Sequence, residues 1–331
     1  MSRSTPPLAT VTDAVLEASV IGSFSAIGPR VRGRLQHWGP AVGDLHGRTY
    51  VVTGATSGIG RAAATMLSAA GARVFVTGRD SARTVQAATE ITAAADSSEP
   101  GVEPIAADMG ELDQVRAAVD DIASRCDHLD GVLHNAGALS ATRTESSAGV
   151  ESTVASQVHG PFLATHLLLD LLRAAPSPAR VVTMSSGGMY AAPLTVDGLQ
   201  MPSESYRGAD QYARVKRAQV TLTRMYAERL DPTGSDVVFH AVHPGWVDTP
   251  GVEESLPRFH RVLSPVLRTP DEGADTAVWL LANDGEPATT TGGFWCDRRQ
   301  RGIHRLPSTR RSDTADRRRR LWDEVCAAVG I

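Results

Sequence analysis

From residue 48 onward, short runs of apolar and mostly β-branched residues alternate with longer Ala-rich stretches of helical character. The runs that we expect to form strands are Thr49–Thr53, Arg73–Thr77, Val102–Ala107, Leu129–His134, Arg180–Ser185 and Val237–Val242. The stretches that we expect to form helices are Gly58–Ala70, Ser81–Ala95, Leu112–Cys126, Gly149–Ala174 and Tyr212–Leu230. Nearly all-apolar strands that alternate with helices are typical of a parallel sheet covered on both faces. The pattern predicts an α/β fold with a doubly wound parallel sheet (Rossmann-type), which binds ligands at the carboxyl ends of its strands.

The flanking segments differ from this repeating unit in composition. Residues 1–45 are rich in Ser, Thr, Pro and Gly and are interpreted as an N-terminal arm with one short helix around Asp13–Ser25. The single Rossmann-type domain is expected to span residues 46–296, and residues 297–331 form a C-terminal tail with a helix. The elements expected after the sixth strand are a Pro-punctuated segment (His243–Pro270), a helix (Asp271–Ala282), a short strand near Gly293–Cys296 and an amphipathic last helix beginning near the solvated run Arg317–Arg320.

Composition excludes several classes of protein. A formal net charge of -4 on 331 residues gives no electrostatic reason to expect nucleic-acid or membrane-surface binding. No apolar stretch approaches the roughly 20 residues of a membrane span, and Asp13 and Glu17 interrupt any signal-peptide core. Three widely separated cysteines encode neither a disulfide framework nor a metal cluster. We therefore expect a cytoplasmic protein without a bound metal.

One residue type is nearly absent from the chain. Of the 33 basic residues, Lys216 is the single lysine. Because arginine is accepted almost everywhere else, this lysine is a candidate for chemistry that a guanidinium group cannot perform. The alternative is chance survival in an Arg-biased composition.

A glycine-rich turn joins the first strand to the first helix of the predicted domain. Gly54, Gly58 and Gly60 allow the backbone to turn sharply and to approach a pyrophosphate closely. The free N–H groups and the positive dipole end of the following helix favour an anion at the same point. A glycine triplet between a strand and a helix of a βαβ unit indicates a dinucleotide site.

The end of the second strand bears on which dinucleotide binds. NAD-binding sites of this type place an acidic residue there, which accepts hydrogen bonds from the ribose hydroxyls. Here Gly78 stands at that position, and Arg79 follows it, where it can meet a 2′-phosphate. The sequence favours NADP. The alternatives are that Asp80 binds the ribose of NAD, or that Asp80 only caps the next helix while Arg79 faces solvent.

A second group of polar residues is predicted at the same sheet edge. Ser185 and Ser186 end the fifth strand, and Asn135, Ala136 and Gly137 end the fourth. Tyr212 and Lys216 are four residues apart in a helix and so share one face. A nearby ammonium group and a cationic nicotinamide ring would lower the pKa of a phenol, which otherwise lies near 10. Tyr212 is then the expected acid/base, Lys216 its electrostatic partner and ribose ligand, and Ser186 the group that orients a carbonyl or alcohol.

These motifs together resemble the short-chain dehydrogenase/reductase family. They are TGATSGIG at 53–60, Asp108, NAG at 135–137, Ser186, YARVK at 212–216 and HPGWVDT at 243–249. SSGGMY, the long separation from Ser186 to Tyr212 and FWCDRR resemble the dehydrogenase/reductase member 12-like subgroup. The resemblance implies a catalytic role for Ser186, Tyr212 and Lys216. It implies that the cofactor is lined by Gly54, Ser57, Gly58, Ile59, Arg79, Asp108, Asn135 and Thr249.

One position departs from the family pattern. The resemblance implies an Asn three residues before a Gly, which holds a water in a proton relay, but this chain has Gln157 before Gly160. Glutamine keeps the amide on a longer arm. We expect the relay to be rebuilt, so that Gln157 completes the catalytic set.

Two further segments are expected near the substrate. The loop Gly187–Gln211 is predicted to border the cleft, and Trp246–Leu267 to form an apolar lid over the nicotinamide end. The apolar side chains of the lid segment could instead form a subunit contact in a homo-oligomer. His243 is interpreted as a packing or turn residue. The sequence thus predicts an NADP(H)-dependent oxidoreductase acting on an alcohol or carbonyl group of a small or lipophilic molecule; the alternative is a cofactor-binding scaffold or redox sensor with little turnover.

Overall fold

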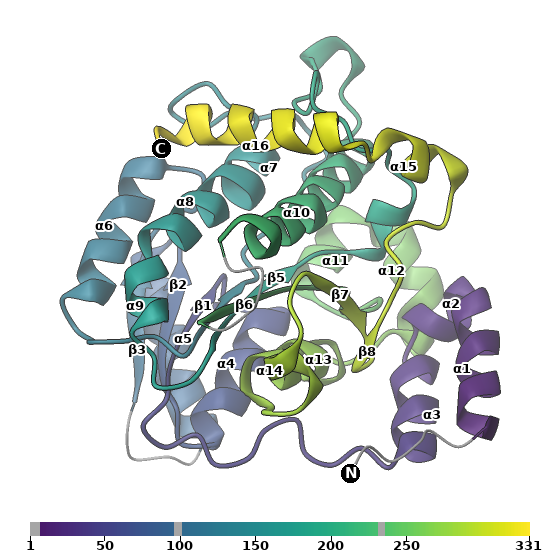
Figure 1. Ribbon diagram of the computed structural model, residues 1–331, viewed down its shortest axis with the longest axis horizontal. Helices are drawn as coiled ribbons and strands as arrows, with labels where there is room; N and C mark the ends of the chain where they lie inside the picture. The colour runs from purple at the N-terminus through teal and green to yellow at the C-terminus, as the bar shows by residue number, and fades with distance from the viewer. Residues whose placement is uncertain (1–6, 96–100, 231–235) are drawn as a thin grey trace.

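The computed structural model describes residues 7–95, 101–230 and 236–331, and within them the chain builds one eight-stranded sheet of order β3-β2-β1-β4-β5-β6-β7-β8 (Figure 1). The strands are β1 (Thr49–Thr53), β2 (Arg73–Gly78), β3 (Val102–Ala106), β4 (Gly131–His134), β5 (Ala179–Met184), β6 (Val237–Val242), β7 (Gly293–Cys296) and β8 (Arg299–Gln300). Strands β1–β7 pair in parallel, and β8 pairs antiparallel with β7. This confirms the predicted doubly wound fold. The order reverses direction between β1 and β4, which is where such folds bind ligands.

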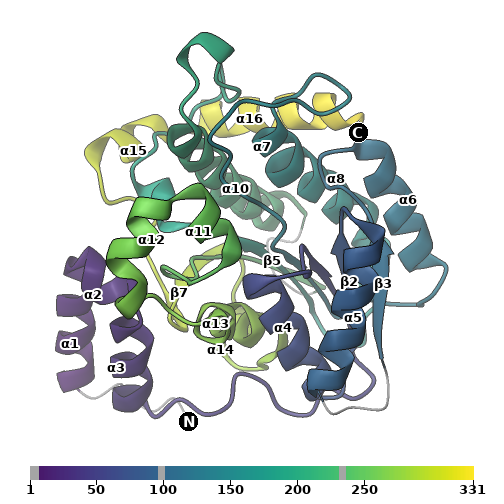
Figure 2. The ribbon, with the colours of Figure 1, turned by 180° about the vertical axis from the view of Figure 1, so that it is seen from behind.

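Helices cover both faces of the sheet (Figures 1 and 2). One layer contains α4 (Gly58–Ala69), α5 (Ser81–Ala95) and α13 (Pro270–Ala282), and the other contains α6 (Leu112–Ala123), α8 (Gly160–Leu167), α9 (Leu169–Arg173), α10 (Gly208–Leu230) and α16 (Ala315–Val329). Alternate residues of β1 serve the two layers: Val51 packs under the second layer, whereas Tyr50 and Val52 pack under the first. Burial on both faces explains why the strands are apolar throughout.

The prediction of one continuous helix over Gly149–Ala174 is wrong about where the helix starts and about its continuity. Gly149 is in a turn with φ of +74°, and the Glu151 carboxylate accepts hydrogen bonds from the backbone N–H groups of Thr153 and Val154. The helix therefore begins with α7 (Ser152–Val154). A π-helical turn, Ala155–His159, follows before α8 and interrupts the regular helix.

The N-terminal segment is more helical than the sequence indicates. In place of one short helix it forms α1 (Pro7–Ala18), α2 (Val20–Phe24) and α3 (Ile27–Gln36). Ser19 separates α1 from α2 because its hydroxyl caps α2 at the N–H of Gly22. The three helices pack beside β7 and β8, at the edge of the sheet farthest from β3 (Figure 1).

The remaining elements follow β5, β6 and β8. They are single 3₁₀ turns at Gly187–Tyr190, Ser203–Ser205 and Ser264–Val266, and the helices α11 (Pro250–Ser255), α12 (Pro257–Leu263), α14 (Glu286–Thr289) and α15 (Pro307–Ser312). In the described part of the chain, no helix is both long and apolar enough to cross a bilayer.

Candidate active site

The glycine turn after β1 is packed so closely that residues with a side chain cannot take the place of its glycines. Gly54 has φ of +66°, and a Cβ added to it would lie 2.7 Å from the Cα of Ala136. A Cβ on Gly60 would lie 2.4 Å from the Nδ2 atom of Asn135, and one on Gly58, whose φ is +55°, would lie 3.0 Å from the Cγ2 atom of Thr249. The turn, the end of β4 and the segment after β6 therefore meet at one place.

The helix that follows this turn offers its first N–H groups to a ligand. Ser57 is exposed at the N-cap of α4, and its hydroxyl makes no capping hydrogen bond. The first turn of α4 has no acidic side chain. Free N–H groups beside a glycine cradle fit the pyrophosphate of a dinucleotide. Ile59 lies on the same turn and is half-buried.

The Asn135–Gly137 segment braces the glycine turn from the neighbouring strand. The Nδ2 atom of Asn135 donates to the carbonyl oxygens of Thr53 and Gly54, each at 3.1 Å. The backbone N–H groups of Asn135 and Ala136 both donate to the Thr53 hydroxyl at 3.0 Å. Gly137 is exposed at the sheet edge. The asparagine thus fixes the backbone of the cradle, and no amide hydrogen of its side chain is left over for direct contact with a cofactor.

The end of β2 has no space for the acidic residue of an NAD site. A Cβ on Gly78 would lie 2.4 Å from the Thr84 hydroxyl and 2.5 Å from the Cγ2 atom of Thr56. The Oδ1 atom of Asp80 accepts from the N–H of Arg83 at 2.8 Å, so this carboxylate caps α5. Arg79 is exposed, and none of the ion pairs between described residues includes it.

Asp108 and Thr249 lie at turns on the same edge of the sheet. The Oδ1 atom of Asp108, just after β3, accepts from the N–H of Gly110 at 2.8 Å. The Thr249 hydroxyl caps α11 by accepting from Val252 at 3.3 Å. Both side chains are partly exposed.

The predicted catalytic residues come together between β5 and α10. Lys216 is 2% exposed, and its Nζ atom donates to the carbonyl oxygen of Met184 at 2.8 Å. The same Nζ atom lies 5.1 Å from the centre of the Tyr212 ring. The Ser185 hydroxyl donates to the carbonyl oxygen of Lys216 at 3.1 Å and so ties β5 to α10. Ser186 accepts from the N–H of Gly188 at 3.2 Å, and its hydroxyl group is also hydrogen-bonded to the Tyr212 phenol.

The two titratable groups have pKa values moved by burial. Burial lowers the pKa of Lys216 from 10.5 to about 7. Burial also raises the pKa of Tyr212 to about 12, and only the hydrogen bond with Ser186 opposes this rise. The side chains of the protein alone therefore do not lower the phenol pKa as the sequence led us to expect, because an ammonium group with a pKa near 7 is only partly charged at neutral pH.

Gln157 lies in the π-helical turn, 1% exposed. Its Nε2 atom donates to the carbonyl oxygen of Ala138 at 2.8 Å, and its Oε1 atom faces Gly137, where an added Cβ would lie 2.6 Å away. Its backbone carbonyl oxygen accepts from the Nε2 atom of Gln219 at 2.6 Å. Reasoning from the sequence missed Gln219, since a glutamine on the inner face of a helix has no motif around it.

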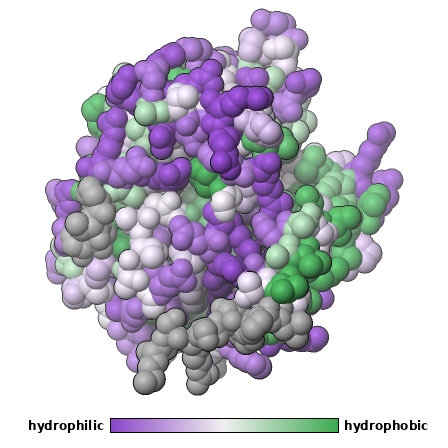
Figure 3. Space-filling view, turned by 45° about the vertical axis from the view of Figure 1, so that its right-hand side comes forward, coloured by the Kyte–Doolittle hydropathy of each residue, from purple (hydrophilic) through white to green (hydrophobic). Residues whose placement is uncertain are grey.

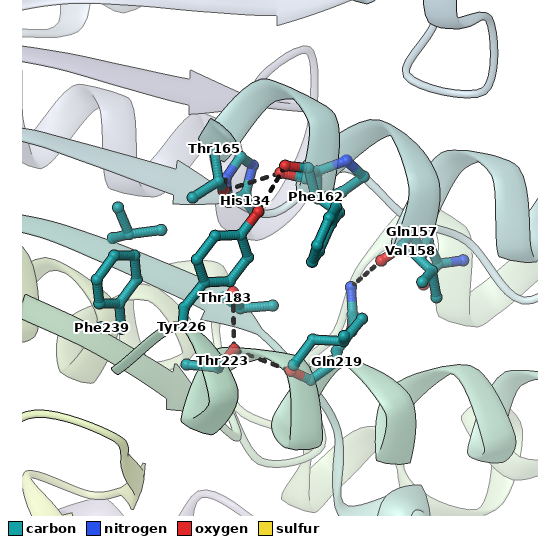
Figure 4. Close-up of a pocket in the computed structure, with 13 residues that line it drawn as sticks. His134, Gln157, Val158, Phe162, Thr165, Thr183, Gln219, Thr223, Tyr226 and Phe239 are labelled. Carbon is teal, nitrogen blue, oxygen red and sulfur yellow. Dashed lines mark hydrogen bonds between the residues drawn. The ribbon is translucent and has the colours of Figure 1, made fainter. Parts of the chain in front are cut away.

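A cavity of about 30 Å³ lies beneath this turn, between the sheet and helices α8 and α10 (Figure 4). His134 borders it; its Nε2 atom lies 2.7 Å from the Thr165 hydroxyl, which itself donates to Pro161, so Nε2 carries the proton. The Nδ1 atom of His134 and the Oε1 atom of Gln219 are buried acceptors with no protein donor in the described structure. The volume holds roughly two waters. None of Ser186, Tyr212 and Lys216 lines this cavity, so it is separate from the catalytic group.

The segment Trp246–Leu267 folds as α11 and α12 over the open side of the site. The Ser255 hydroxyl donates to the carbonyl oxygen of Leu139, next to the Asn135–Gly137 segment, at 2.8 Å. Trp246 and Phe259 meet edge to face, with ring centres 5.3 Å apart, and both are only partly buried. The segment that the sequence predicts to be an apolar lid therefore contacts the loop after β4 through Ser255.

His243 has the packing role that the sequence indicates. Its Nδ1 atom accepts from the backbone N–H groups of Gly187 at 3.0 Å and of Gly245 at 3.3 Å. Burial and nearby arginines keep its pKa well below the usual value. The neutral imidazole ring accepts these two hydrogen bonds and so links the turn after Ser186 to the turn after β6. Among the described residues, no group of three His, Cys, Asp or Glu side chains could hold a metal ion.

The chain matches the short chain dehydrogenase family over residues 48–258 and belongs to that family. It is 34% identical over 273 residues to "Dehydrogenase/reductase SDR family member 12" of Bos taurus, an alignment that covers 82% of this chain and 83% of that protein. It is 33% identical to "Retinol dehydrogenase 14" of Homo sapiens, with 92% of each chain covered. Among solved structures, the "RhlG/NADP active-site complex" of Pseudomonas aeruginosa superposes with a TM-score of 0.62 and 27% identity over 76% of this chain and 94% of that chain.

Family membership and site agree at the level of chemistry. The protein is an NAD(P)-dependent oxidoreductase that interconverts an alcohol and a carbonyl group on a small molecule. The resemblance to the member 12-like subgroup is confirmed by the first of these relatives.

Proposed function

We propose that this protein is an NADP(H)-dependent oxidoreductase that interconverts an alcohol and a carbonyl group on an apolar small molecule, with Tyr212 as the acid/base. The observation that carries the proposal is the buried Lys216 ammonium group, held against Met184 with its Nζ atom 5.1 Å from the centre of the Tyr212 ring. Bound at the glycine turn, the cofactor supplies or accepts the hydride.

The chain's own residues supply orientation and the proton. In the reducing direction, the Ser186 hydroxyl donates a hydrogen bond to the carbonyl oxygen of the substrate and holds it beside Tyr212. Tyr212 then gives its phenolic proton to that oxygen. Lys216 stabilises the resulting phenolate, and its remaining N–H groups can reach the ribose hydroxyls. Its protonated form is the one that serves both roles.

Preference for NADP is supported by the end of β2. Gly78 has no space for a carboxylate, and Asp80 already caps α5. An exposed Arg79 without an ion-pair partner in the described structure is available for the additional phosphate. Charge-assisted hydrogen bonds of this kind contribute about 1.5–3 kcal/mol.

An apolar substrate is supported by the partly exposed aromatic pair Trp246 and Phe259 beside the site. Retinol, after which one relative is named, is an apolar alcohol and fits the same class of substrate. We also place the protein in the reducing cytoplasm, in line with its three free cysteines, Cys126, Cys296 and Cys326. As the alternative role of the segment Trp246–Leu267, we propose a subunit contact in a homo-oligomer.

The test combines cofactor titration with turnover of a panel of apolar ketones and aldehydes. NADPH should bind more tightly than NADH by about one to two orders of magnitude. Tyr212→Phe should bind NADPH as the unmodified protein does, since the phenol is not part of the glycine cradle, while turnover falls by about 10²–10⁴-fold. Equal affinity for the two cofactors would contradict the NADP proposal. A protein that binds NADPH but reduces no carbonyl would instead be the cofactor-binding scaffold.

A further inference from the structure

The three N-terminal helices lie outside the part of the chain that matches the family, which begins at residue 48. They nevertheless reach the catalytic turn through Phe24, at the end of α2, which is 6% exposed. A Cβ on Gly187, the residue after Ser186, would lie 2.6 Å from the Cε2 atom of Phe24. The Phe24 ring therefore lies directly against the Ser186 turn.

The same ring also fixes His243. The two ring centres are 4.2 Å apart at an interplanar angle of 83°. Because His243 holds the N–H groups of Gly187 and Gly245, a ring that confines the imidazole also confines both turns. Phe24 further packs edge to face on Trp246, at 5.8 Å between ring centres.

The backbone around Phe24 anchors both ends of the lid segment. The N–H of Trp246 donates to the carbonyl oxygen of Phe24 at 2.7 Å, where the lid begins. The N–H of Ala26 donates to the carbonyl oxygen of Val266 at 2.9 Å, where the lid ends. Arg268 follows the lid and donates from Nε to the carbonyl oxygen of Phe24 at 3.1 Å and from a terminal nitrogen to that of Ser23 at 2.7 Å.

We propose that helices α1–α3 are a positioning element of the active site, and that Phe24 is a positioning residue that orders the Ser186 turn and the lid through His243 and Trp246. This proposal rests on the proposed function, which gives the Ser186 turn its catalytic role. The contacts themselves are made by residues that precede the segment matched by the family model. An element that holds both ends of the lid segment also limits how far that segment can move relative to the Ser186 turn.

The test measures amide hydrogen exchange by mass spectrometry together with kinetics. Phe24→Ala removes the ring, and Phe24→Leu keeps most of the apolar volume. In Phe24→Ala, exchange should accelerate in peptides covering residues 184–190 and 243–249, while peptides covering β1 and β2 keep their rates. For the proposed reaction, kcat/KM for the carbonyl substrate should fall by about 10- to 100-fold, with the Kd for NADPH unchanged. Phe24→Leu should restore part of both effects.

The matched control is Phe75→Leu. Phe75 is a fully buried aromatic residue of β2 that packs in the main core away from these turns. The substitution should lower thermal stability and leave exchange at residues 184–190 and 243–249 as in the unmodified protein. Equal acceleration in Phe75→Leu and Phe24→Leu would overturn the positioning role, because the effect would then be general loosening. If no carbonyl is reduced by the unmodified protein, the proposed function fails, while the exchange comparison still tests whether Phe24 orders the two turns.

Discussion

Lys216 carries an ammonium group into the interior, where a carbonyl oxygen receives it in place of a carboxylate. Elsewhere the chain pairs its most deeply buried cations with acids or with several carbonyl groups, as at Arg32 and Arg268. Without a counter-ion, burial lowers the pKa of Lys216 to about 7. The residue is therefore poised to gain a proton when an anion arrives.

We expect NADPH binding to take up protons on this account. A dinucleotide phosphate brings negative charge near Lys216 and raises its pKa, so between about pH 7 and 9 the complex should hold more protons than the free protein. Calorimetric titration in buffers of different ionisation enthalpy measures this uptake, which should approach one proton near pH 8. It should vanish in Lys216→Met, which cannot titrate. Uptake of the same size in that variant would assign the titration to another group.

The linkage also has a consequence for stability without cofactor. Because the folded-state pKa of Lys216 lies below its unfolded value of about 10.5, the unfolded chain binds more protons between pH 7 and 10.5. The unfavourable contribution is fully present below pH 7 and disappears as the pH rises toward 10.5. The lysine thus lowers the stability of the free protein at neutral pH, which is a cost typical of groups placed for function.

At the scale of elements, the π-helical turn at Ala155–His159 shows what the sequence could and could not predict. The apolar periodicity of Gly149–Ala174 predicted a helix over the correct region, and Gln157 was singled out by its spacing to Gly160. Pro161 has no N–H to donate to the carbonyl oxygen of Gln157 four residues before it, and Gln219, 62 residues further along than Gln157, donates to that oxygen instead. A hydrogen bond between distant segments leaves no periodic signal, so only the folded structure shows it.

We expect Gln219→Leu to destabilise this turn. The change removes the donor to a buried carbonyl oxygen while keeping an apolar stem, and one unsatisfied buried acceptor costs about 1–3 kcal/mol of the free energy of unfolding. Urea denaturation at pH 7 measures the loss. Gln86→Leu is the control, since the Gln86 side chain lies on the exposed face of α5 with Glu90 as its partner. Equal stability of the two variants would show that another donor reaches the Gln157 carbonyl.

At the scale of the whole molecule, the Rossmann-type sheet and its catalytic edge were predictable because each strand and helix carries its own periodicity. The N-terminal helices were not predictable, because α1 buries a charged side chain and exposes apolar ones. Its Asp13 is 5% exposed and faces inward, whereas Val11 and Val15 are more than 60% exposed. The apolar side chains of this segment are visible as a green area on the surface (Figure 3). The burial of a polar residue such as Asp13 can be explained only once its partners are known.

Those partners form a buried ion-pair network that joins both ends of the chain. Arg32 of α3 donates to Asp13 at 2.7 Å and also pairs with Asp297, which follows β7. Asp297 in turn accepts from Arg268 at 2.6 Å, next to the lid. The side chains of Arg32, Asp297 and Arg268 are each 1% exposed. Asp297 is therefore the carboxylate that joins the buried guanidinium groups of Arg32 and Arg268, and it connects the N-terminal helices, the sheet edge and the lid segment.

This asymmetry predicts a rank order of stability between variants of the network. Asp297→Asn leaves two buried guanidinium groups facing a neutral amide and should lower the free energy of unfolding by about 3–5 kcal/mol. Arg32→Met should cost less, because Asp297 keeps Arg268 and Asp13 keeps Arg301 at 2.8 Å. Arg319→Ala, which removes an exposed pair with Asp316, should change stability by less than about 1 kcal/mol. Thermal and urea unfolding of the three variants at pH 7 gives the order directly. If Arg32→Met lowered the free energy of unfolding as much as Asp297→Asn does, the stability of the network would depend on its number of ion pairs and not on the central carboxylate.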